Sequence, residues 1–341
     1  MIAPEILEKY MRRCLQLAAL GLGSVQPNPM VGAVIVKDDY IIGEGYHQRY
    51  GEAHAEVNAI NSVKQPELLK ESTLYVNLEP CSHFGKTPPC VDKIIACGIP
   101  RVVVGVGDPH AKVNGRGIAT LREAGVDVMT YVLKEECTFA NRRFFTFHCK
   151  QRPYIILKWA QTADGRMDID RILHKNESYW ITNDEMRVLV HKWRSEEQAI
   201  LIGYSTYQND KPALTTRYYT GKSPARFIMT NNIEKSPSIE GFTFLPENIE
   251  EALQTLYNAS IQSIIIEGGK KTLARFMDAN CWDEARVLSG RQQWGSGLEA
   301  PQLPVAYAQK MVINDNIYER YFNDQQVADL FRSDKEILAR F

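Results

Sequence analysis

His54-Ala55-Glu56 is followed, one strand's length further along the chain, by Glu79-Pro80-Cys81 and then by Cys90. One imidazole and two thiolates are typical zinc ligands, and a site with three protein ligands keeps a fourth position open for water. A structural zinc site is closed by four protein ligands, so this pattern predicts a catalytic one. The carboxylate of Glu56 is not needed as a ligand and is free to shuttle protons. We therefore expect one zinc ion per chain, held by His54, Cys81 and Cys90, with Glu56 as the catalytic residue.

The order of these residues is that of the zinc-dependent nucleobase deaminases, whose signature is H-x-E followed by P-C-x-x-C. In this chain eight residues, 82–89, separate the two cysteines. The longer spacer brings His83 and Lys86 to the edge of the metal site, where they can contact a substrate. Pro88-Pro89 before Cys90 indicates the first turn of a helix, whose N-terminus favours the thiolate form of a cysteine. The pattern predicts hydrolytic loss of ammonia.

The composition is that of an ordinary globular protein. At 341 residues the chain is long enough for two domains, each with its own core. A formal net charge of −1 provides no general attraction for a nucleic-acid backbone. The seven cysteines lack the spacing of a disulfide framework and the N-terminus lacks a signal pattern, which favours a cytoplasmic protein. Apolar stretches all fall short of the ~18 residues that a membrane span requires, so we expect no membrane partner.

Predicted strands and helices alternate along the chain, which indicates α/β layers. In the first half we expect strands at 31–36, 41–46, 73–78, 101–106 and 126–131. We expect a first helix that contains Tyr10 to Leu20 and ends at Gly21, and further helices near His54, Cys90 and Ile118. A helical stretch from about residue 134 to residue 147 precedes the polar residues 148–153, where we place the domain boundary. In the second half we expect strands at 154–159, 198–202, 225–229 and 264–266 and helices at 184–193 and 249–259. The predicted domains are 1–147 and 153–341.

Glu267-Gly268-Gly269 lies between a predicted strand and a predicted helix. Glycines in that place let backbone N–H groups approach a phosphate. The stretch is neither G-x-G-x-x-G nor a Walker loop, and an ordinary tight turn is an equally good interpretation. These residues by themselves leave both interpretations open.

Longer stretches in both halves follow one known pattern. In the first half they are Gln26 to Gly32, Gly43 to His47, His54 to Glu56, Glu79 to His83, Thr87 to Cys90, Asp108-Pro109 and Gly115 to Gly117. In the second half they are Lys158 to Gly165, Ser178 to Thr182, Arg194, Asp210 to Arg217 and Glu267 to Gly269. In this order, over nearly the whole chain, they closely resemble the bifunctional deaminase–reductase family of riboflavin biosynthesis. The resemblance implies a cytidine-deaminase-like three-layer N-terminal domain followed by a dihydrofolate-reductase-like α/β C-terminal domain.

The resemblance also implies two consecutive reactions. The first domain would remove the 2-amino group of 2,5-diamino-6-(5-phosphoribosylamino)pyrimidin-4(3H)-one, with zinc and Glu56. The second would use NADPH to reduce the ribosyl group at C1′ to a ribityl chain. The implied substrate contacts are Asn28, His47, His83, Lys86 and Asp108 in the first domain, and Lys158, Ser178, Arg194, Leu214, Arg217 and Glu267 in the second. The implied NADPH contacts are Ala160, Trp180, Thr206, Asp210, Thr230, Gly269, Lys270, Lys271, Thr272, Leu273, Ala274 and Arg275. Arg194 and Arg217 suit a phosphate because a guanidinium group makes planar bidentate contacts.

Three other interpretations are weighed against this one. A nucleic-acid base deaminase predicts a basic excess and a short cysteine spacer, and the chain has neither. A noncatalytic zinc-stabilised binding protein predicts a fourth protein ligand, for which Cys97 is the nearest unassigned thiol. A deaminase whose second domain binds substrate without reducing it stays open, since Tyr204 and Lys211 depart from the family's reductase pattern. The expected partner is a small phosphorylated pyrimidine, while homo-oligomerisation, channelling between sites and the choice of NADPH over NADH stay open.

Overall fold

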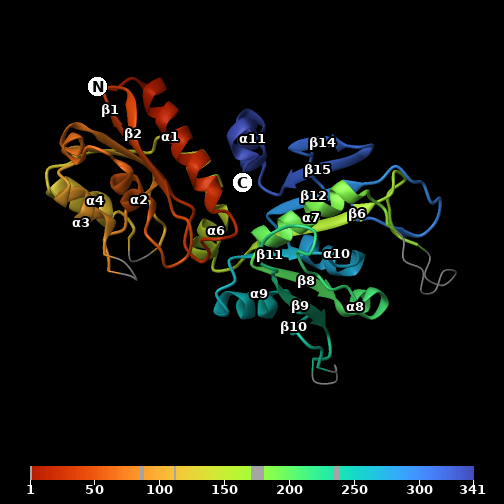
Figure 1. Cartoon of the computed structure of the whole chain (residues 1–341). Helices are drawn as coiled ribbons and strands as arrows, with labels where there is room; N and C mark the ends of the chain where they lie inside the picture. Colours follow the sequence, from red (N-terminus) through yellow and green to blue (C-terminus); the bar gives the residue numbers. More distant parts are fainter. Residues whose placement is uncertain (1, 85–87, 111–112, 170–179, 234–237) are drawn as a thin grey trace. The chain divides into compact units, whose positions relative to one another are not determined.

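The computed structural model describes residues 2–84, 88–110, 113–169, 180–233 and 238–341. The chain divides into two compact units, which we call unit 1 (Met1–Lys150 with Asp334–Phe341) and unit 2 (Gln151–Ser333) (Figure 1). The change from one unit to the next falls within the polar stretch 148–153. The last eight residues were expected in the second domain but group with unit 1. They include α12 (Lys335–Leu338), whose Ile337 and Leu338 are buried and which contacts helices of unit 1.

A five-stranded sheet runs through unit 1 in the order β2-β1-β3-β4-β5. Its strands are β1 (Gly32–Lys37), β2 (Tyr40–Tyr46), β3 (Thr73–Leu78), β4 (Arg101–Val106) and β5 (Asp127–Thr130). β1 pairs antiparallel with β2 and β3, while β3, β4 and β5 are parallel. Ala33 and Ile35 enter one core, and the alternate residue Val34 is buried on the opposite face.

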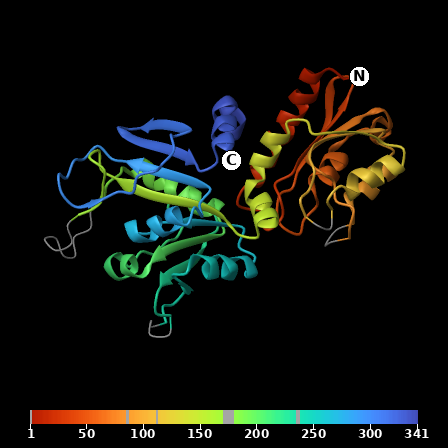
Figure 2. The same ribbon diagram turned by 180° about the vertical axis from the view of Figure 1, so that it is seen from behind.

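Helices cover both faces of this sheet (Figures 1 and 2). The helices are α1 (Pro4–Ala18), α2 (Ala55–Ser62), α3 (Cys90–Ala96), α4 (Arg116–Glu123), α5 (Lys134–Ala140) and α6 (Arg142–Lys150), with short 3₁₀ turns at Ala19–Gly21 and Pro66–Glu71. Apolar residues of α2, α3 and α4 share the core of Ala33 and Ile35. On the other face Tyr10 of α1 packs against Tyr75 of β3, with ring centroids 5.1 Å apart. The expected three-layer fold is confirmed.

The helical stretch expected over 134–147 is in fact two helices, α5 and α6, which meet at Asn141. The buried side chain of Asn141 accepts a hydrogen bond from the N–H of Met30 at 2.7 Å and donates one to the carbonyl oxygen of Met30 at 2.9 Å. Asn141 has φ −103° and ψ 23°, outside the helical range. The expected helical stretch is therefore interrupted at Asn141, because a long-range contact holds this residue.

An eight-stranded sheet forms unit 2, in the order β10-β9-β8-β11-β6-β12-β15-β14. Its strands are β6 (Tyr154–Gln161), β8 (Ala199–Gly203), β9 (Ala225–Thr230), β10 (Thr243–Pro246), β11 (Ser263–Ile266), β12 (Glu284–Ser289), β14 (Gln309–Ile313) and β15 (Asn316–Phe322). The strands from β10 to β12 are parallel, and β15 and β14 continue the sheet antiparallel. A separate short pair joins β7 (Arg166–Asp168) to β13 (Leu298–Glu299).

Both faces of the unit 2 sheet are covered by helices. The helices are α7 (Asp184–Glu196), α8 (Tyr204–Asp210), α9 (Ile249–Asn258), α10 (Lys270–Asp278) and α11 (Gln325–Ser333). On β11, Ile264 and Ile266 pack in the core with α9 and α10, while Ile265 packs with α7. Parallel strands end at a common edge of the sheet, so residues that follow β8 and β11 are brought together there. None of the helices in the described part of the chain has the length and apolarity needed to cross a membrane.

Candidate metal centre and ligand cleft

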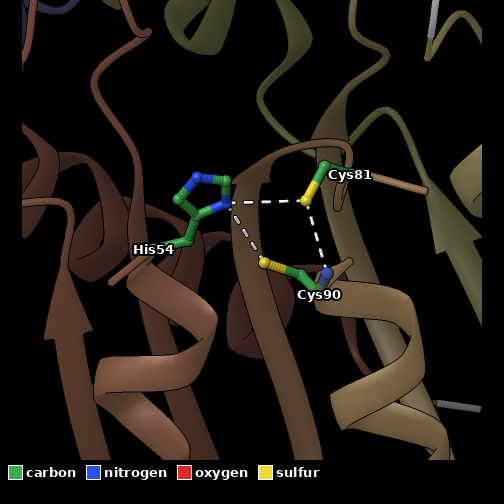
Figure 3. A group of neighbouring side chains, drawn as sticks. All are labelled: His54, Cys81 and Cys90. Carbon is green, nitrogen blue, oxygen red and sulfur yellow. Dashed lines mark hydrogen bonds between the residues drawn. The ribbon is translucent and has the colours of Figure 1, made fainter. Parts of the chain in front are cut away.

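His54, Cys81 and Cys90 converge from three separate elements of unit 1 (Figure 3). His54 caps the N-terminus of α2, Cys81 follows β3, and Cys90 is the first residue of α3. The Nδ1 atom of His54 lies 3.5 Å from Sγ of Cys81 and 3.3 Å from Sγ of Cys90. Ligands bound to tetrahedral zinc at their usual bond lengths lie about 3.5 Å apart, so the three atoms fit a zinc ion.

The two thiols differ in protonation before a metal binds. A hydrogen bond from Cys90 lowers the pKa of Cys81 to about 4, and the same interaction raises the pKa of Cys90 above its usual value. Cys81 is therefore the more acidic of the two thiols, and a zinc ion bound here would be held by both cysteines as thiolates. Within the described residues no fourth ligand joins the group, and Cys97 caps the opposite end of α3. The site thus keeps the open position that a catalytic zinc requires.

Glu56 lies in the first turn of α2, two residues after His54, and is only 3% exposed. Burial, followed by the charge of Cys81, raises the pKa of Glu56 to about 7. A carboxyl group with a pKa near neutrality can both accept and return a proton at physiological pH.

The structure brings Asn28 and His47 next to the metal ligands. Asn28 Nδ2 lies 3.0 Å from Nε2 of His47, and the His47 ring lies edge-on to that of His54 at 5.3 Å. Nδ1 of His47 is 3.1 Å from the carbonyl oxygen of Ala53, and burial lowers the pKa of His47. Both ring nitrogens of His47 have partners, so the ring is held in place beside the metal ligands. The contacts of Asn28 and His47 with the substrate stay a prediction.

His83 and Asp108 lie in the loops after Cys81 and after β4. The rings of His83 and His110 stack at 6.3 Å, and the ring of His148 on α6 lies 4.8 Å from that of His110. Burial raises the pKa of Asp108 to about 7, and its carboxylate accepts the N–H of His110 at 2.7 Å. Lys86 lies outside the described residues. His148 is part of this row of rings but belongs to no recognisable motif, so it could not be selected from the sequence.

Glu79 organises the loop on which Asp108 lies. Its carboxylate accepts four backbone N–H groups, from Asp108 at 3.1 Å, Gly115 at 3.0 Å, Gly117 at 2.9 Å and Ile118 at 3.2 Å. Glu79 is 4% exposed, so these bonds are shielded from water. The sequence contains Glu79 within the E-P-C motif, but its partners are some 30 to 40 positions away and only the folded chain reveals them.

Unit 2 contains a cavity of about 560 Å³. Ten of the residues predicted as substrate or cofactor contacts line it, namely Lys158, Ala160, Trp180, Arg194, Thr206, Asp210, Leu214, Arg217, Glu267 and Gly269. They come from β6, from the segment before α7, from α7 and α8, and from the loops that follow α8 and β11, so they are far apart in sequence. Ser178 lies outside the described residues.

The remaining predicted cofactor contacts are not among the residues that line the cavity. Thr230 ends β9 and is buried, and Thr206 Oγ1 accepts the N–H of Gly269 at 3.2 Å, which fixes the start of α10. Leu273 is fully buried in the core of unit 2. The other predicted contacts in α10 are Lys270, Lys271, Thr272, Ala274 and Arg275. Their contact with a cofactor stays a prediction.

A cluster of charges occupies one wall of the cavity. Arg194 makes a two-point ion pair with Glu267, and the Nζ atom of Lys158 lies 3.6 Å from Oε2 of the same carboxylate. Burial alone would raise the pKa of Glu267, but Arg194 and Lys158 outweigh it and lower the pKa to about 2. Burial lowers the pKa of Lys158.

Arg187 and His191 also line the cavity and were not selected from the sequence. They precede Arg194 by seven and three positions, the spacing that places side chains on one face of a helix. The spacing of these three residues can be read from the sequence. It does not show which face of the helix borders the cavity, because α7 carries polar residues on more than one face.

Two family models match the chain. Residues 4–106 match the cytidine and deoxycytidylate deaminase zinc-binding region, and residues 153–296 match the RibD C-terminal domain. The riboflavin biosynthesis protein RibD of Aquifex aeolicus is 39% identical over 331 residues, covering 88% of this chain and 91% of the relative. RibD of Bacillus amyloliquefaciens is 37% identical over 311 residues, covering 81% and 82%.

Solved structures agree with these matches over the whole fold. The diaminohydroxyphosphoribosylaminopyrimidine deaminase/5-amino-6-(5-phosphoribosylamino)uracil reductase of Thermotoga maritima is 34% identical with a TM-score of 0.81, covering 93% of this chain and 98% of that one. Acinetobacter baumannii RibD is 28% identical with a TM-score of 0.82, covering 94% and 99%.

The fold and the two sites define a zinc-dependent deaminase of the cytidine deaminase type joined to a reductase. Zinc and NADPH are the cofactors of the two domains. The chain belongs to the RibD family of bifunctional riboflavin biosynthesis proteins. The resemblance found in the sequence is thereby confirmed.

Proposed function

We propose that the chain deaminates 2,5-diamino-6-(5-phosphoribosylamino)pyrimidin-4(3H)-one and then reduces the ribosyl group of the product to a ribityl chain with NADPH. The observation that carries this proposal is the presence of two sites in one chain. The first is the site of His54, Cys81 and Cys90 beside Glu56, and the second is the cavity of unit 2 that contains Glu267. The Thermotoga maritima relative, named for these two activities, supports the choice of substrate.

In the deaminase site, zinc held by His54, Cys81 and Cys90 supplies Lewis-acid activation of a water molecule. The Glu56 carboxylate would carry two protons in turn, the first from the water to a pyrimidine ring nitrogen and the second from the resulting hydroxyl group on C2 to the departing amino group. Water adds at C2 and ammonia leaves, so a carbonyl replaces the amino group. Asn28 and His47 orient the ring, because their polar atoms are held beside His54.

In the unit 2 cavity, NADPH supplies a hydride when it is bound. Lys158 and Glu267 present a donor and an acceptor that suit the hydroxyl groups of a ribosyl chain. Trp180 is 60% exposed and offers a flat apolar surface to a ring. We also propose that the remaining predicted contacts bind substrate or NADPH. They include Ser178, Lys86 and the α10 residues.

The proposed place of action is the cytoplasm. All seven cysteines are free thiols, and such a set is typical of a reducing compartment. The proposed partners are the phosphorylated pyrimidine substrate and its deaminated product.

The test is a coupled assay on zinc-loaded protein, supplied with the diaminopyrimidinone phosphate and NADPH. Release of ammonia followed by loss of the nicotinamide absorbance is the expected result, with neither in a Glu56→Gln variant. Ammonia without NADPH oxidation, even when the deaminated product is supplied directly, would overturn the reductase half. Absence of ammonia would overturn the deaminase half, and in that case the deaminated intermediate tests the reductase by itself.

A further inference from the structure

A single carboxylate, that of Asp164, joins two segments of unit 2 that are far apart in sequence. Asp164 lies in the turn 162–165 between β6 and β7, and its partners lie in the loop 290–297 after β12. Its Oδ2 atom accepts the N–H of Gly295 at 2.8 Å, and its Oδ1 atom accepts the N–H of Trp294 at 3.2 Å. The turn and the loop are thus connected through two backbone groups of the loop.

The charge of this carboxylate is stabilised by its hydrogen bonds. The hydroxyl group of Thr162 donates to Oδ1 of Asp164 and contributes most to the lowering of the Asp164 pKa to about 2. The N–H groups of Gly295 and Trp294 lower this pKa further. Asp164 is therefore charged at neutral pH, and hydrogen bonds to a charged acceptor are stronger than those between neutral groups.

Trp294, whose N–H is bound by Asp164, lines the unit 2 cavity. Its indole N–H donates to Oε1 of Gln292 at 3.2 Å, and Nε2 of Gln292 donates to the carbonyl oxygen of Trp180 at 3.4 Å. The carbonyl oxygen of Gln292 accepts the N–H of Ala163, in the turn, at 2.8 Å. Gln292 therefore connects Trp294 both with the turn and with Trp180, a second tryptophan of the cavity lining.

The sequence of the loop 290–297 indicates that these hydrogen bonds define its conformation. The loop contains three glycines, and Trp294 is its one large apolar residue. Glycine leaves the backbone many conformations, and a single apolar side chain provides little packing to choose among them. Arg291 of the loop pairs with Asp315, but the two side chains are 75% and 73% exposed, so solvent weakens this pair. The contacts with Asp164 are therefore the ones expected to hold Trp294 in place.

We propose that Trp294 forms a wall of the reductase site against the planar ring of a ligand, and that Asp164 is the residue that positions this wall. The inference rests on the proposed function, which supplies two ligands with such a ring, the pyrimidine of the substrate and the nicotinamide of NADPH. An indole ring stacks favourably on a planar ring of either kind. Asp164 itself is not among the residues that line the cavity, so it acts through the loop and not on the ligand.

The test compares wild type with Trp294→Leu, Asp164→Ala, the double variant that combines both changes, and the control Asp315→Ala. Asp315 is also an aspartate that contacts this loop, but it binds the exposed side chain of Arg291 and does not line the cavity. Thermal unfolding of each variant checks that the fold is retained. Calorimetry measures binding of NADPH and of the deaminated substrate in separate titrations. Each ligand is compared with a fragment that lacks the ring, adenosine 2′,5′-bisphosphate for NADPH and ribose 5-phosphate for the substrate.

Trp294→Leu should weaken the binding of one complete ligand by about 3- to 10-fold, as expected for loss of an aromatic stacking contact. Its ring-free fragment should bind as it does to wild type, and the ligand affected identifies the ring. Asp164→Ala should weaken the same ligand by a similar factor, and Asp315→Ala should not. In the double variant the two losses should not add, because Asp164 acts through Trp294. Unchanged binding of both complete ligands to Trp294→Leu, or an equal loss with a fragment, would overturn the inference.

Hydrogen exchange tests the role of Asp164 without any ligand. The amides of Trp294 and Gly295 should exchange about 10-fold faster in Asp164→Ala and at the wild-type rate in Asp315→Ala. Unchanged exchange in Asp164→Ala, or binding losses that add fully in the double variant, would overturn the positioning role. A wild type that binds both ligands but does not oxidise NADPH would contradict the proposed reduction, while the wall and its positioning are still decided by the binding series.

Discussion

Arg194 and Glu267 form a two-point ion pair in which Nε lies 3.0 Å from Oε1 and Nη2 lies 2.7 Å from Oε2. The side chains are 11% and 9% exposed, so the pair is largely removed from water. The sequence expectation gave Arg194 a bidentate contact with the substrate phosphate. In the structure that geometry is present, but its partner is a carboxylate of the protein. Arg194 therefore sets the position and charge of Glu267.

Replacing Arg194 with Lys should lower kcat/KM of the reductase by about 10-fold or more, because an ammonium group cannot make the two-point pair. Since Arg194 acts through Glu267, the loss should be equal for phosphorylated and dephosphorylated substrates. Steady-state kinetics with both substrates measures this. A loss confined to the phosphorylated substrate would contradict the positioning role. Ammonia release by unit 1 is the internal control and should not change.

Replacing Glu56 with Gln should reduce ammonia release by at least about 100-fold, because the amide cannot carry a proton between water and the leaving group. Zinc content should stay at one per chain, since Glu56 is not a ligand. Metal analysis and an ammonia assay on the same sample measure both. His54→Ala is the comparison and should lose zinc as well as activity. A Glu56→Gln variant that loses its zinc would show that the carboxylate has a structural role.

Replacing Glu79 with Gln should loosen the loop that carries Asp108. The amide group of Gln places a donor where the carboxylate accepts backbone N–H groups, at a cost of about 2 kcal/mol. Hydrogen exchange of Gly115, Gly117 and Ile118 should become about 30-fold faster. Glu71→Gln is the control, because Glu71 pairs with Lys37 at an exposed site. Unchanged exchange at these three amides would mean that the Glu79 bonds do not hold the loop.

His191 should make unit 2 less stable in acid. Burial, helped by Arg194 and Arg217, lowers the pKa of His191 from 6.5 to about 4. The unfolded chain then binds more protons than the folded one between these values, so the free energy of unfolding falls as pH drops from about 6.5 to about 4. His191→Gln should remove this part of the pH dependence.

Tryptophan fluorescence during urea unfolding reports this effect selectively, since all five tryptophans lie in unit 2, at Trp159, Trp180, Trp193, Trp282 and Trp294. His148 is the matched control, because its pKa is also lowered to about 4 but it lies in unit 1. His148→Gln should leave the fluorescence transition and its pH dependence unchanged. The prediction fails if His191→Gln has the same pH dependence as wild type.

The zinc site could be predicted from the sequence because each ligand lies at the end of a regular element. His54 and Cys90 begin helices and Cys81 follows a strand, and the helical and strand patterns around them are local. The strands at 73–78 and 101–106 were predicted with the bounds that the structure has. In the strand at 101–106, the run of buried valines from Val102 to Val104 leaves little choice of conformation.

Long-range contacts account for what the sequence could not predict. The break at Asn141 depends on Met30, and the place of Ile337 and Leu338 in unit 1 depends on packing of α12 against α1 and α5. In each case the local pattern gives no sign of a partner more than a hundred positions away.

By itself, the sequence determined the α/β class, the zinc ligands, Glu56 and the family, since these depend on residue type at short spacing. Only the tertiary structure decided which charged groups are already paired. The carboxylate of Glu79 accepts hydrogen bonds from N–H groups of a distant loop, and Arg194 is paired with Glu267. The Nε atom of Arg187, in contrast, has no hydrogen-bond partner in the described structure. The physical reason is that an ion pair or a hydrogen bond depends on distance and burial, which folding sets between residues that are far apart in the chain.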